Sequence, residues 1–235
     1  MPARVLILAG TAEARALCGA CAGLDVLASL AGATAHPADL GVPTRVGGFG
    51  GEAGFRAALA GVRAVLDATH PFAEAMTDRA VRVCGELGVP YLRLTRAGWP
   101  MERDWCRYGS AENVTAALRQ EARVLLTTGP GSLESFIGRG LALWCRRVDR
   151  APPKVGVEWI VGTPPFSLAE ETALLRDLGI TDLVTKNSGG PRAKLDAAGA
   201  LGVRVHVIDR PVPAGGAETH DIAEALDFVR AHAAD

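Results

Sequence analysis

The stretch that decides the fold is VLILAGTAEAR, residues 5–15. Its first five residues form a continuous apolar run, which is typical of a strand covered on both faces of a parallel sheet. Gly10 and Thr11 follow as a turn, and the alanine-rich segment 11–23 predicts a helix that ends at Gly23. A strand, a glycine-containing turn and a helix in this order indicate the first βαβ unit of an α/β fold.

The same alternation continues along the whole chain. The further expected strands are 24–32, 44–48, 64–69, 90–96, 123–129, 141–148, 159–162, 182–186 and 204–211. The further expected helices are 51–61, 72–88, 110–120, 132–138, 167–179, 193–202 and 220–233. Tryptophans, a proline and mixed charges interrupt this rhythm at 97–110, which suggests a domain crossing. We therefore expect two Rossmann-like doubly wound parallel-sheet domains, 1–105 and 106–235, with an interdomain cleft.

Charge and composition narrow the classes of function. The 25 Lys and Arg residues nearly equal the 26 Asp and Glu residues, which argues against a dedicated nucleic-acid-binding protein. Because arginine binds carboxylates through two hydrogen bonds, an anionic substrate remains open. The apolar run in MPARVLILAG (residues 1–10) is too short for a signal peptide, and no segment has the length of a membrane span. We therefore expect a cytoplasmic protein without a membrane partner.

Several chemical motifs are missing from the sequence. Cys18 and Cys21 form a CxxC, but no second cysteine pair or histidine lies near them, which favours core side chains over metal or redox chemistry. No histidine pair has metal-ligand spacing, so no metal site is expected. GxSxG, the Walker lysine motif and the Tyr-x-x-x-Lys pair of short-chain dehydrogenases are absent.

The turn after the first strand is a candidate anion site. Ligands bind open parallel α/β sheets beyond the carboxyl ends of the strands. Gly10 permits close backbone approach, Thr11 can cap the helix, and the helix start offers free N–H groups, although a plain turn would look the same. Rossmann proteins that prefer NAD carry an acid after the second strand, whereas SLAGAT (29–34) has none, which favours NADP if a dinucleotide binds. The loop VGGFGG (46–51) offers exposed amides or is an ordinary loop.

The turn after the fourth strand carries a histidine in LDATHPFAEAM, residues 66–76. Pro71 suits the first position of a helix, and it biases His70 away from helical backbone angles. The imidazole is thus expected on a rigid elbow, beside Asp67 and Thr69 at the mouth of the cleft. It would act as a proton donor or as a hydrogen-bond donor to a substrate, and a structural histidine that caps carbonyls is the alternative.

The second half repeats this arrangement. Thr127, Thr128 and Gly129 follow one strand, and Asn187–Gly190 form a polar turn after another. That turn has Lys186 on one side and Arg192 and Lys194 on the other, which suits a phosphate or carboxylate. Arg210, at the end of the last strand, is expected to face the same cleft.

These stretches are together similar to the precorrin-6A reductases of cobalamin biosynthesis. The resemblance spans nearly the whole chain and is carried by VLILAGTAEAR, SLAG, VGGFGG, DATHPFA, LLTTG, and TKNSGG followed by AKLDAA and RP. It implies NADPH-dependent reduction of one carbon–carbon double bond in a ring-contracted tetrapyrrole rich in acetate and propionate arms, giving precorrin-6B. One position departs from the family pattern: SLAG is often followed by arginine, whereas Ala33 stands here, so another cation such as Arg45 would have to replace it.

This hypothesis assigns a role to each candidate residue. His70 is the candidate catalytic group. The candidate substrate-binding residues are Asp67, Thr69, Phe72, Lys186 and Arg210. The candidate NADPH-binding residues are Gly10, Thr11, Ala12, Arg15, Ser29, Gly32, Thr128, Gly129, Asn187, Ser188, Gly189, Gly190 and Lys194. We expect a small-molecule tetrapyrrole substrate, no nucleic-acid partner, and a chain able to act as a monomer. The alternatives are a non-catalytic two-domain protein that senses NADP or another metabolite, and a reductase of another anionic substrate.

Overall fold

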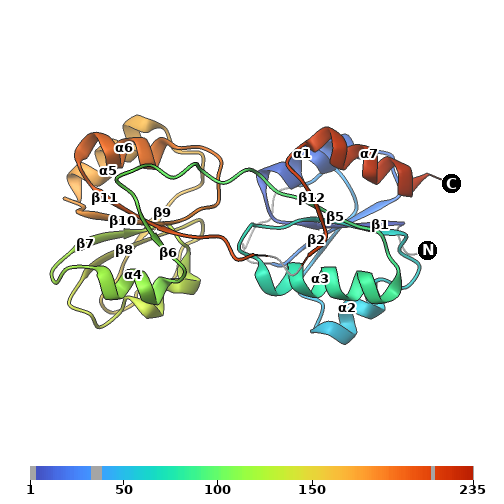
Figure 1. The fold of residues 1–235 in the computed structure, drawn as a ribbon, viewed down its shortest axis with the longest axis horizontal. Coiled ribbons are helices and arrows are strands. Elements are labelled where there is room, and N and C mark those ends of the chain that lie inside the picture. Colours follow the sequence, from blue (N-terminus) through green and yellow to red (C-terminus); the bar gives the residue numbers. More distant parts are fainter. Residues whose placement is uncertain (1–3, 33–38, 213–214, 235) are drawn as a thin grey trace. The chain divides into compact units, whose positions relative to one another are not determined.

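The protein folds into two compact α/β units. The computed structural model describes residues 4–32, 39–212 and 215–234. Met1–Ala97 and Pro211–Asp235 form the first unit, and Gly98–Arg210 form the second. Each unit holds one six-stranded parallel sheet with helices on both faces (Figure 1). The expected fold class, two parallel-sheet α/β domains, is confirmed.

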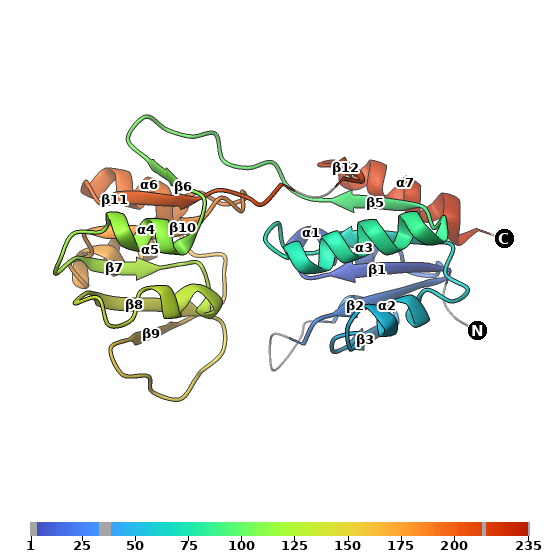
Figure 2. The same cartoon turned by 60° about the horizontal axis from the view of Figure 1, so that its bottom comes forward.

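The sheet of the first unit has the strand order β12-β5-β4-β1-β2-β3 (Figure 2). Its strands are β1 (Val5–Ala9), β2 (Val26–Leu30), β3 (Thr44–Val46), β4 (Ala64–Ala68), β5 (Tyr91–Leu94) and β12 (Ala217–Thr219). Its helices are α1 (Ala12–Ala20) and α7 (Ile222–Ala233) on one face, and α2 (Glu52–Ala58) and α3 (Glu74–Leu87) on the other (Figure 1). The central strands β1 and β4 are buried along their whole length, because helices cover both faces.

Alternate residues of β1 enter two separate cores. Val5 and Ile7 pack with the apolar side chains of α1 and α7. Leu6 and Leu8 pack with Phe55 of α2 and with α3 on the opposite face. Successive side chains of a strand point to opposite faces, so only a continuous apolar run fills both cores. This explains the sequence VLILA.

The sheet of the second unit has the order β6-β11-β10-β7-β8-β9 (Figure 2). Its strands are β6 (Cys106–Tyr108), β7 (Arg123–Leu126), β8 (Ala142–Arg147), β9 (Glu158–Val161), β10 (Asp182–Lys186) and β11 (Arg204–Ile208). Its helices are α5 (Leu168–Asp177) and α6 (Ala193–Leu201) on one face, and α4 (Ala111–Ala117) and the 3-10 helix η1 (Pro130–Ser135) on the other (Figure 1). The segment expected as a helix at 132–138 is therefore this shorter 3-10 helix.

The chain is divided differently from the expected boundary between residues 105 and 106. The C-terminal segment returns to the first unit, where β12 pairs with β5 and Ala225 and Val229 of α7 enter the core beside β1. Trp99 lies in the core of the second unit, so the crossing comes before it. The edge strands β6 and β12 were not expected, whereas the equally short edge strand β3 was. Three residues are too few for a period-two pattern to identify a strand by itself.

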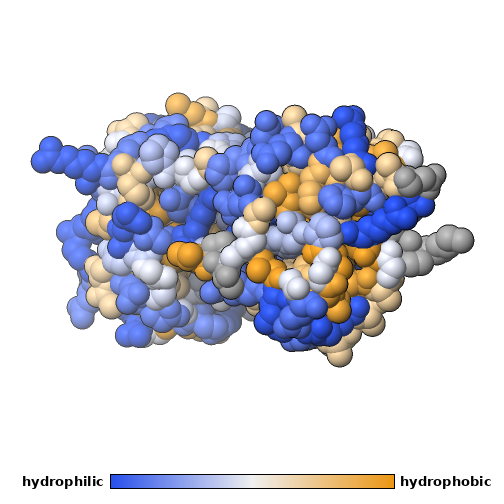
Figure 3. All heavy atoms as spheres, turned by 45° about the vertical axis from the view of Figure 1, so that its right-hand side comes forward, coloured by the Kyte–Doolittle hydropathy of each residue, from blue (hydrophilic) through white to orange (hydrophobic). Residues whose placement is uncertain are grey.

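The surface mixes polar and apolar side chains, as Figure 3 shows for one face. The large apolar side chains that are exposed are Val46, Leu87, Val148, Val155, Val161, Leu168 and Val212. Within the described ranges, no helix has both the length and the apolar character that crossing a membrane requires.

Candidate active site

Two loops meet at the carboxyl edge of the first sheet, because β1 and β4 are neighbours. A Cβ atom built on Gly10 would lie 3.8 Å from the backbone N of His70 and 3.9 Å from Cα of Thr69. The Thr11 hydroxyl donates a hydrogen bond of 3.1 Å to the carbonyl of Ala68. The turn after β1 and the histidine elbow after β4 are therefore in direct contact, as parallel-sheet topology predicts.

Helix α1 begins at this contact. The Thr11 hydroxyl accepts a hydrogen bond of 3.0 Å from the N–H of Ala14, so the expected helix cap is confirmed. The first N–H groups of a helix have no acceptor within it, which makes this end suitable for an anion. Ala12 and Arg15 are exposed in this first turn. Glu13 lies there too, with its carboxylate 3.4 Å from the guanidinium of Arg96.

A cation is held at the carboxyl end of β2. Arg45 of β3 lies opposite Ser29 in register and donates to its hydroxyl at 2.8 Å. The same guanidinium donates to the carbonyl of Gly48 at 2.9 Å and stacks 4.2 Å from the centroid of the Phe49 ring. Gly32 has a φ of +79°, a conformation that favours glycine. Ala33, where the family pattern often has arginine, lies outside the described residues.

The glycine-rich loop 46–51 is anchored to α2. Phe49 packs against Phe55 edge-on, with ring centroids 5.0 Å apart. A Cβ atom at Gly54 would lie 1.7 Å from the carbonyl oxygen of Phe49, which no side chain can tolerate. The loop therefore needs Gly54 for its close approach to the helix.

Asp67 lies below the histidine elbow and is fully buried. Its Oδ1 accepts from the N–H of Thr69 at 3.0 Å and from the Thr69 hydroxyl at 2.6 Å. Its Oδ2 accepts from the Thr77 hydroxyl at 2.8 Å and the Tyr91 hydroxyl at 2.9 Å. A buried carboxylate satisfied by four internal donors has an internal role. The geometry thus does not support the expected contact between Asp67 and a substrate, and gives Asp67 the role of fixing Thr69.

The buried carboxylate changes the acidity of its neighbours. Burial, and next the negative charge of Asp67, raise the pKa of the Tyr91 phenol. The same two causes, in the same order, raise the pKa of the Cys84 thiol to about 11. Tyr91 therefore stays protonated at neutral pH and remains a hydrogen-bond donor to Asp67.

His70 is half-buried at the elbow. Its Nδ1 lies 3.2 Å from the backbone N–H of Phe72, so Nδ1 accepts and the neutral ring carries its proton on Nε2. The Phe72 ring lies 5.9 Å from the imidazole, centroid to centroid. Pro71 was expected to begin the helix, but His70–Ala73 form a turn, closed by the Ala73 N–H and the His70 carbonyl, before α3 starts at Glu74.

In the second unit, the Asn-Ser-Gly-Gly turn after β10 is held by Trp99. The Asn187 side chain accepts from the Trp99 N–H at 2.8 Å and donates to the Trp99 carbonyl at 3.3 Å. The Trp99 indole N–H donates to the Gly190 carbonyl at 2.8 Å. Gly189 and Gly190 have φ values of +69° and +82°, where glycine is favoured. The Asn187 amide thus holds the turn against Trp99, and the expected cofactor contact of Asn187 stays a prediction.

Cations surround this turn. The Arg210 Nε donates to the Asn187 carbonyl at 2.6 Å, and the Lys194 ammonium lies 5.0 Å from the centroid of the Trp99 ring. Ser188 is half-buried, and its N–H donates to the Lys186 carbonyl at 2.7 Å. Burial lowers the pKa of the Lys186 ammonium. Arg210 thus contacts the turn directly, and Lys194 lies beside the Trp99 ring that holds the turn. Arg192, the third cation expected beside the turn with Lys186 and Lys194, pairs with Glu102 and Asp196.

The Thr-Thr-Gly turn after β7 is also held internally. The Thr127 hydroxyl donates to the Val184 carbonyl of β10 at 3.1 Å. Thr128 is buried, with its hydroxyl 2.5 Å from that of Ser132. Gly129 has a φ of +79° and leads into η1. The turn therefore lies beside β10 on the carboxyl edge of the second sheet.

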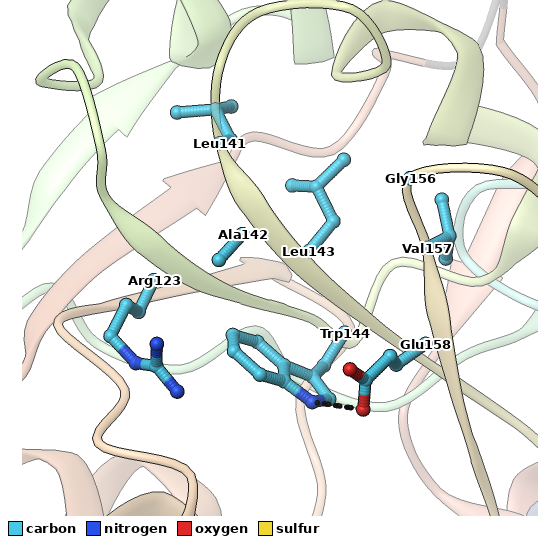
Figure 4. A pocket seen from close by; sticks show the side chains of 8 residues that line it. All are labelled: Arg123, Leu141, Ala142, Leu143, Trp144, Gly156, Val157 and Glu158. Atoms are coloured by element: carbon cyan, nitrogen blue, oxygen red, sulfur yellow. Dashed lines mark hydrogen bonds between the residues drawn. The ribbon is translucent and has the colours of Figure 1, made fainter.

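A hollow of about 490 Å³ lies at the opposite edge of the second sheet. Figure 4 shows its lining residues Arg123, Leu141, Ala142, Leu143, Trp144, Gly156, Val157 and Glu158. Three of these begin the strands β7, β8 and β9, so the hollow lies at the amino ends of the strands. Ligands of parallel sheets bind at the carboxyl ends, and this hollow is therefore separate from the candidate site.

Sequence reasoning missed the residues that hold the two turns. Trp99, Thr77, Tyr91 and Arg93 were not among the candidates. A signal was present in YLRL (91–94), because its polar residues alternate with leucines and therefore share one face of a strand. A buried Asp67 requires donors, and the neighbouring strand is where they would be found.

The comparisons with known proteins agree along the full chain. The family model described as Precorrin-6x reductase CbiJ/CobK matches residues 4–230. A precorrin-6A reductase of Mycobacterium tuberculosis strain H37Rv is 42% identical, covering 96% of this chain and 97% of that protein. One of Rhodococcus erythropolis is 39% identical over the same shares. A solved structure of the CobK precorrin-6A reductase matches with a TM-score of 0.90 at 36% identity, covering 99% of this chain and 98% of that one. The chain therefore belongs to the precorrin-6x reductase CbiJ/CobK family.

Proposed function

We propose that this protein reduces one carbon–carbon double bond of precorrin-6A with NADPH, giving precorrin-6B in cobalamin biosynthesis. Membership of a reductase family supports this proposal over a non-catalytic sensor. The observation that carries it is the contact between Gly10 and the His70 elbow, which joins a helix start suited to an anion with an imidazole that carries a proton on Nε2. A cytoplasmic location and action as a monomer belong to the same proposal.

The relatives favour the metal-free macrocycle as substrate. Relatives named precorrin-6A reductase are 42% and 39% identical to this chain. Those named cobalt-precorrin-6A reductase are 32% identical in Priestia megaterium and 31% identical in Methanothermobacter thermautotrophicus. Turnover of the metal-free and cobalt-bearing substrates by the same preparation tests this choice, and we expect a higher kcat/KM for the metal-free form. Equal values for both would contradict it.

The hydrogen-bond donors and the cation at the carboxyl edge of the first sheet suit a nicotinamide dinucleotide, which a reductase of this family requires. The first-turn N–H groups of α1 and the close backbone at Gly10 suit its pyrophosphate. Arg45, held against Ser29 at the carboxyl end of β2, suits a 2′-phosphate. When bound, the reduced nicotinamide supplies a hydride.

The protein's own groups bind and orient the substrate. Lys186 and Arg210 carry positive charges suited to the acetate and propionate arms. His70 offers Nε2–H as a hydrogen-bond donor. As a general acid it passes this proton to the carbon next to the one that receives hydride, and a proton from water restores the neutral ring. Alignment of the two reactants is the remaining contribution of the chain.

Two substitutions at His70 separate proton transfer from orientation. We expect His70→Ala to lower kcat about 100-fold, because general acid catalysis contributes roughly 10²–10⁴. Glutamine keeps a donor near the Nε2 position but does not titrate, so His70→Gln should be as slow as His70→Ala if the ring gives up a proton. Full activity of His70→Gln would make His70 an orienting donor, and full activity of His70→Ala would remove it from the reaction. Turnover is followed by the loss of reduced-nicotinamide absorbance.

Substitution of Arg45 tests the choice of NADPH. We expect Arg45→Ala to weaken NADPH binding about tenfold or more, the effect of a lost charge-assisted hydrogen bond, and to change NADH binding less than about twofold. Arg63→Ala is the matched control, because Arg63 is an exposed arginine of the same unit whose guanidinium donates to the Ala234 carbonyl. Equal weakening of both nucleotides by Arg45→Ala would contradict the 2′-phosphate assignment. Binding is measured by titration calorimetry.

A further inference from the structure

Two buried charged residues contact the elbow: Asp67 binds Thr69, which precedes His70, and Arg93 binds Pro71, which follows it. We propose that Asp67 and Arg93 are positioning residues that fix His70 by holding its two chain neighbours, Thr69 and Pro71. The proposal deepens the proposed function and rests on it, since it takes His70 to be the group that acts on the substrate.

On the amino-terminal side, the holding group is a carboxylate. Asp67 Oδ1 receives both the backbone N–H and the hydroxyl of Thr69, at 3.0 Å and 2.6 Å. Its other oxygen is tied to α3 through Thr77 and to β5 through Tyr91. Hydrogen bonds to an ionised carboxylate are shorter and stronger than neutral ones. Both the backbone and the side chain of Thr69 are thus fixed relative to the sheet and to α3.

On the carboxyl-terminal side, the holding group is a guanidinium. Arg93 is 6% exposed, and its Nη2 donates to the Pro71 carbonyl at 3.3 Å. Its Nη1 lies 3.5 Å from a carboxylate oxygen of Glu218 on β12. Register places Asp67 directly opposite Arg93, and Arg93 directly opposite Glu218. Three neighbouring strands thus carry a row of charges that alternate in sign.

This alternation explains how charged groups can be buried here. A buried charge is unfavourable unless it is paired and hydrogen-bonded. Arg93 has the Glu218 carboxylate 3.5 Å away and Asp67 opposite it in register, while its buried Nε has no hydrogen-bond partner among the described residues. Asp67 is satisfied by four donors. Neutral side chains would fill the space at lower desolvation cost, so the charged row is unnecessary for packing alone. Its distinguishing effect is to hold two backbone positions of one elbow.

A ligand-binding role for Arg93 fits the structure less well. The hollow beside it is lined by Pro71, Glu74, Thr77, Asp78, Arg93 and Pro211. It is too narrow to admit a water molecule, and it contains two acidic side chains that would repel an anion. Arg93 therefore acts on the elbow rather than on a bound carboxylate.

The consequence for His70 is a fixed direction of Nε2–H. Residues 69 and 71 are held by buried charges, and Nδ1 is held by the Phe72 N–H at 3.2 Å. The ring then has little freedom to rotate away from the substrate. Loss of either charge should misdirect the ring while substrate binding continues, which lowers kcat rather than raising KM.

The sharpest test compares two threonines that bind the same carboxylate. Thr69→Val removes the hydroxyl bond on the elbow, and Thr77→Val removes a hydroxyl bond on α3. We expect Thr69→Val to lower kcat about tenfold with KM within about twofold, and Thr77→Val to keep kcat within about twofold, although both lower the denaturation midpoint. Equal kcat values for the two variants would overturn the role of Asp67.

The guanidinium side is tested by three substitutions in the full-length protein. Arg93→Met should lower kcat about tenfold, Arg93→Lys should restore part of it, and Glu218→Gln should keep kcat within about twofold because the Pro71 contact remains. Wild-type kcat in Arg93→Met would overturn the role of Arg93. If that variant does not fold, Arg93→Lys carries the comparison with Glu218→Gln, and equal kcat values for these two would overturn it.

A spectroscopic readout separates this proposal from the proposed function. The imidazole ¹⁵N shifts of His70 report the Nδ1 acceptor bond and the Nε2 proton without any turnover. We expect Thr69→Val and Arg93→Lys to move these shifts and Thr77→Val to leave them in place. Full turnover of His70→Ala would end the proposed role of His70 in the reaction, whereas unmoved shifts in Thr69→Val and Arg93→Lys would end the positioning role.

Discussion

The two turns that carry the candidate chemistry are held in different ways. The elbow after β4 is fixed by a buried carboxylate and a buried guanidinium from its own sheet. The turn after β10 is fixed by Trp99, through neutral hydrogen bonds to Asn187 and Gly190. Trp99 belongs to the connection that follows β5, far from the turn in sequence. The elbow is thus held by buried charged side chains of its own sheet, and the turn after β10 by an aromatic residue that is distant in sequence.

The difference indicates what each turn presents. Charge-assisted bonds on both neighbours of His70 are suited to aiming one side chain. The neutral bonds on Asn187 and Gly190 fix a backbone that needs two glycines at positive φ, with Lys186, Lys194 and Arg210 around it. Such a turn is suited to presenting backbone N–H groups and positive charge to an anion. Four substitutions test whether the two turns differ in this way.

The largest effect is expected from removing the buried carboxylate of the elbow. Asp67→Ala leaves three hydroxyl groups and the Thr69 N–H without their acceptor, and it removes the carboxylate that lies opposite Arg93 in register. We expect a loss of roughly 3–5 kcal/mol in the free energy of unfolding, measured by urea denaturation. Asp227→Ala is the control, because the Asp227 side chain is 76% exposed, and it should change stability by less than about 0.5 kcal/mol. A loss below about 1 kcal/mol for Asp67→Ala would show that the elbow is not held by charge.

A smaller loss is expected at the neutral turn. Asn187→Ala removes two hydrogen bonds to the Trp99 backbone, and we expect a loss of about 2 kcal/mol in the free energy of unfolding. Asn113→Ala is the matched control in the same unit, since Asn113 is exposed and bonds the exposed Ser110 hydroxyl. If Asn187→Ala lowers the free energy of unfolding as much as Asp67→Ala does, the two turns are not held by interactions of different strength.

The indole bond should contribute less again. Trp99→Phe keeps an aromatic ring near Lys194 but removes the N–H that donates to Gly190, and we expect a loss of about 1 kcal/mol. Trp159→Phe is the comparison, because its indole N–H donates to the Pro152 carbonyl at an exposed position where water can replace it. Thermal denaturation of both variants should show the larger shift for Trp99→Phe, and equal shifts would contradict the structural role of the Trp99 bond.

The comparison of the two turns also shows which parts of the fold and of the candidate site can be predicted from the sequence. Apolar runs such as VLILA predict buried strands, and parallel topology then predicts that Gly10, Thr11 and His70 meet at one edge, as observed. The partners of the two turns were not predictable in this way. Trp99 reaches a turn 88 positions further along the chain, and β12 reaches β5 after the chain has passed through the whole second unit. Such pairings depend on tertiary packing, which short-range periodicity does not encode.

The smallest effect concerns the pH dependence of stability at the turn after β10. Burial lowers the pKa of Lys186 below its usual 10.5, because the folded state disfavours the charged ammonium. Between the lowered pKa and 10.5, the unfolded state binds more protons than the folded state, so this group makes stability rise with pH in that window. Below the lowered pKa, the ammonium is charged in both states and the full burial penalty applies.

Lys186→Met removes that penalty and supplies the corresponding test. We expect the variant to be more stable than the wild type at neutral pH, and the difference to shrink as the pH rises towards 10.5, because the wild-type lysine then loses its proton in the folded state. Lys154→Met is the control: Lys154 pairs with Glu134 at the surface, and its difference from the wild type should not shrink in this way. Denaturation midpoints at several pH values give both differences. If the plots of denaturation midpoint against pH for Lys186→Met and the wild type stay parallel across this window, the ammonium of Lys186 is as well solvated as that of a surface lysine. The turn after β10 would then lack the buried cation that its proposed role in carboxylate binding uses.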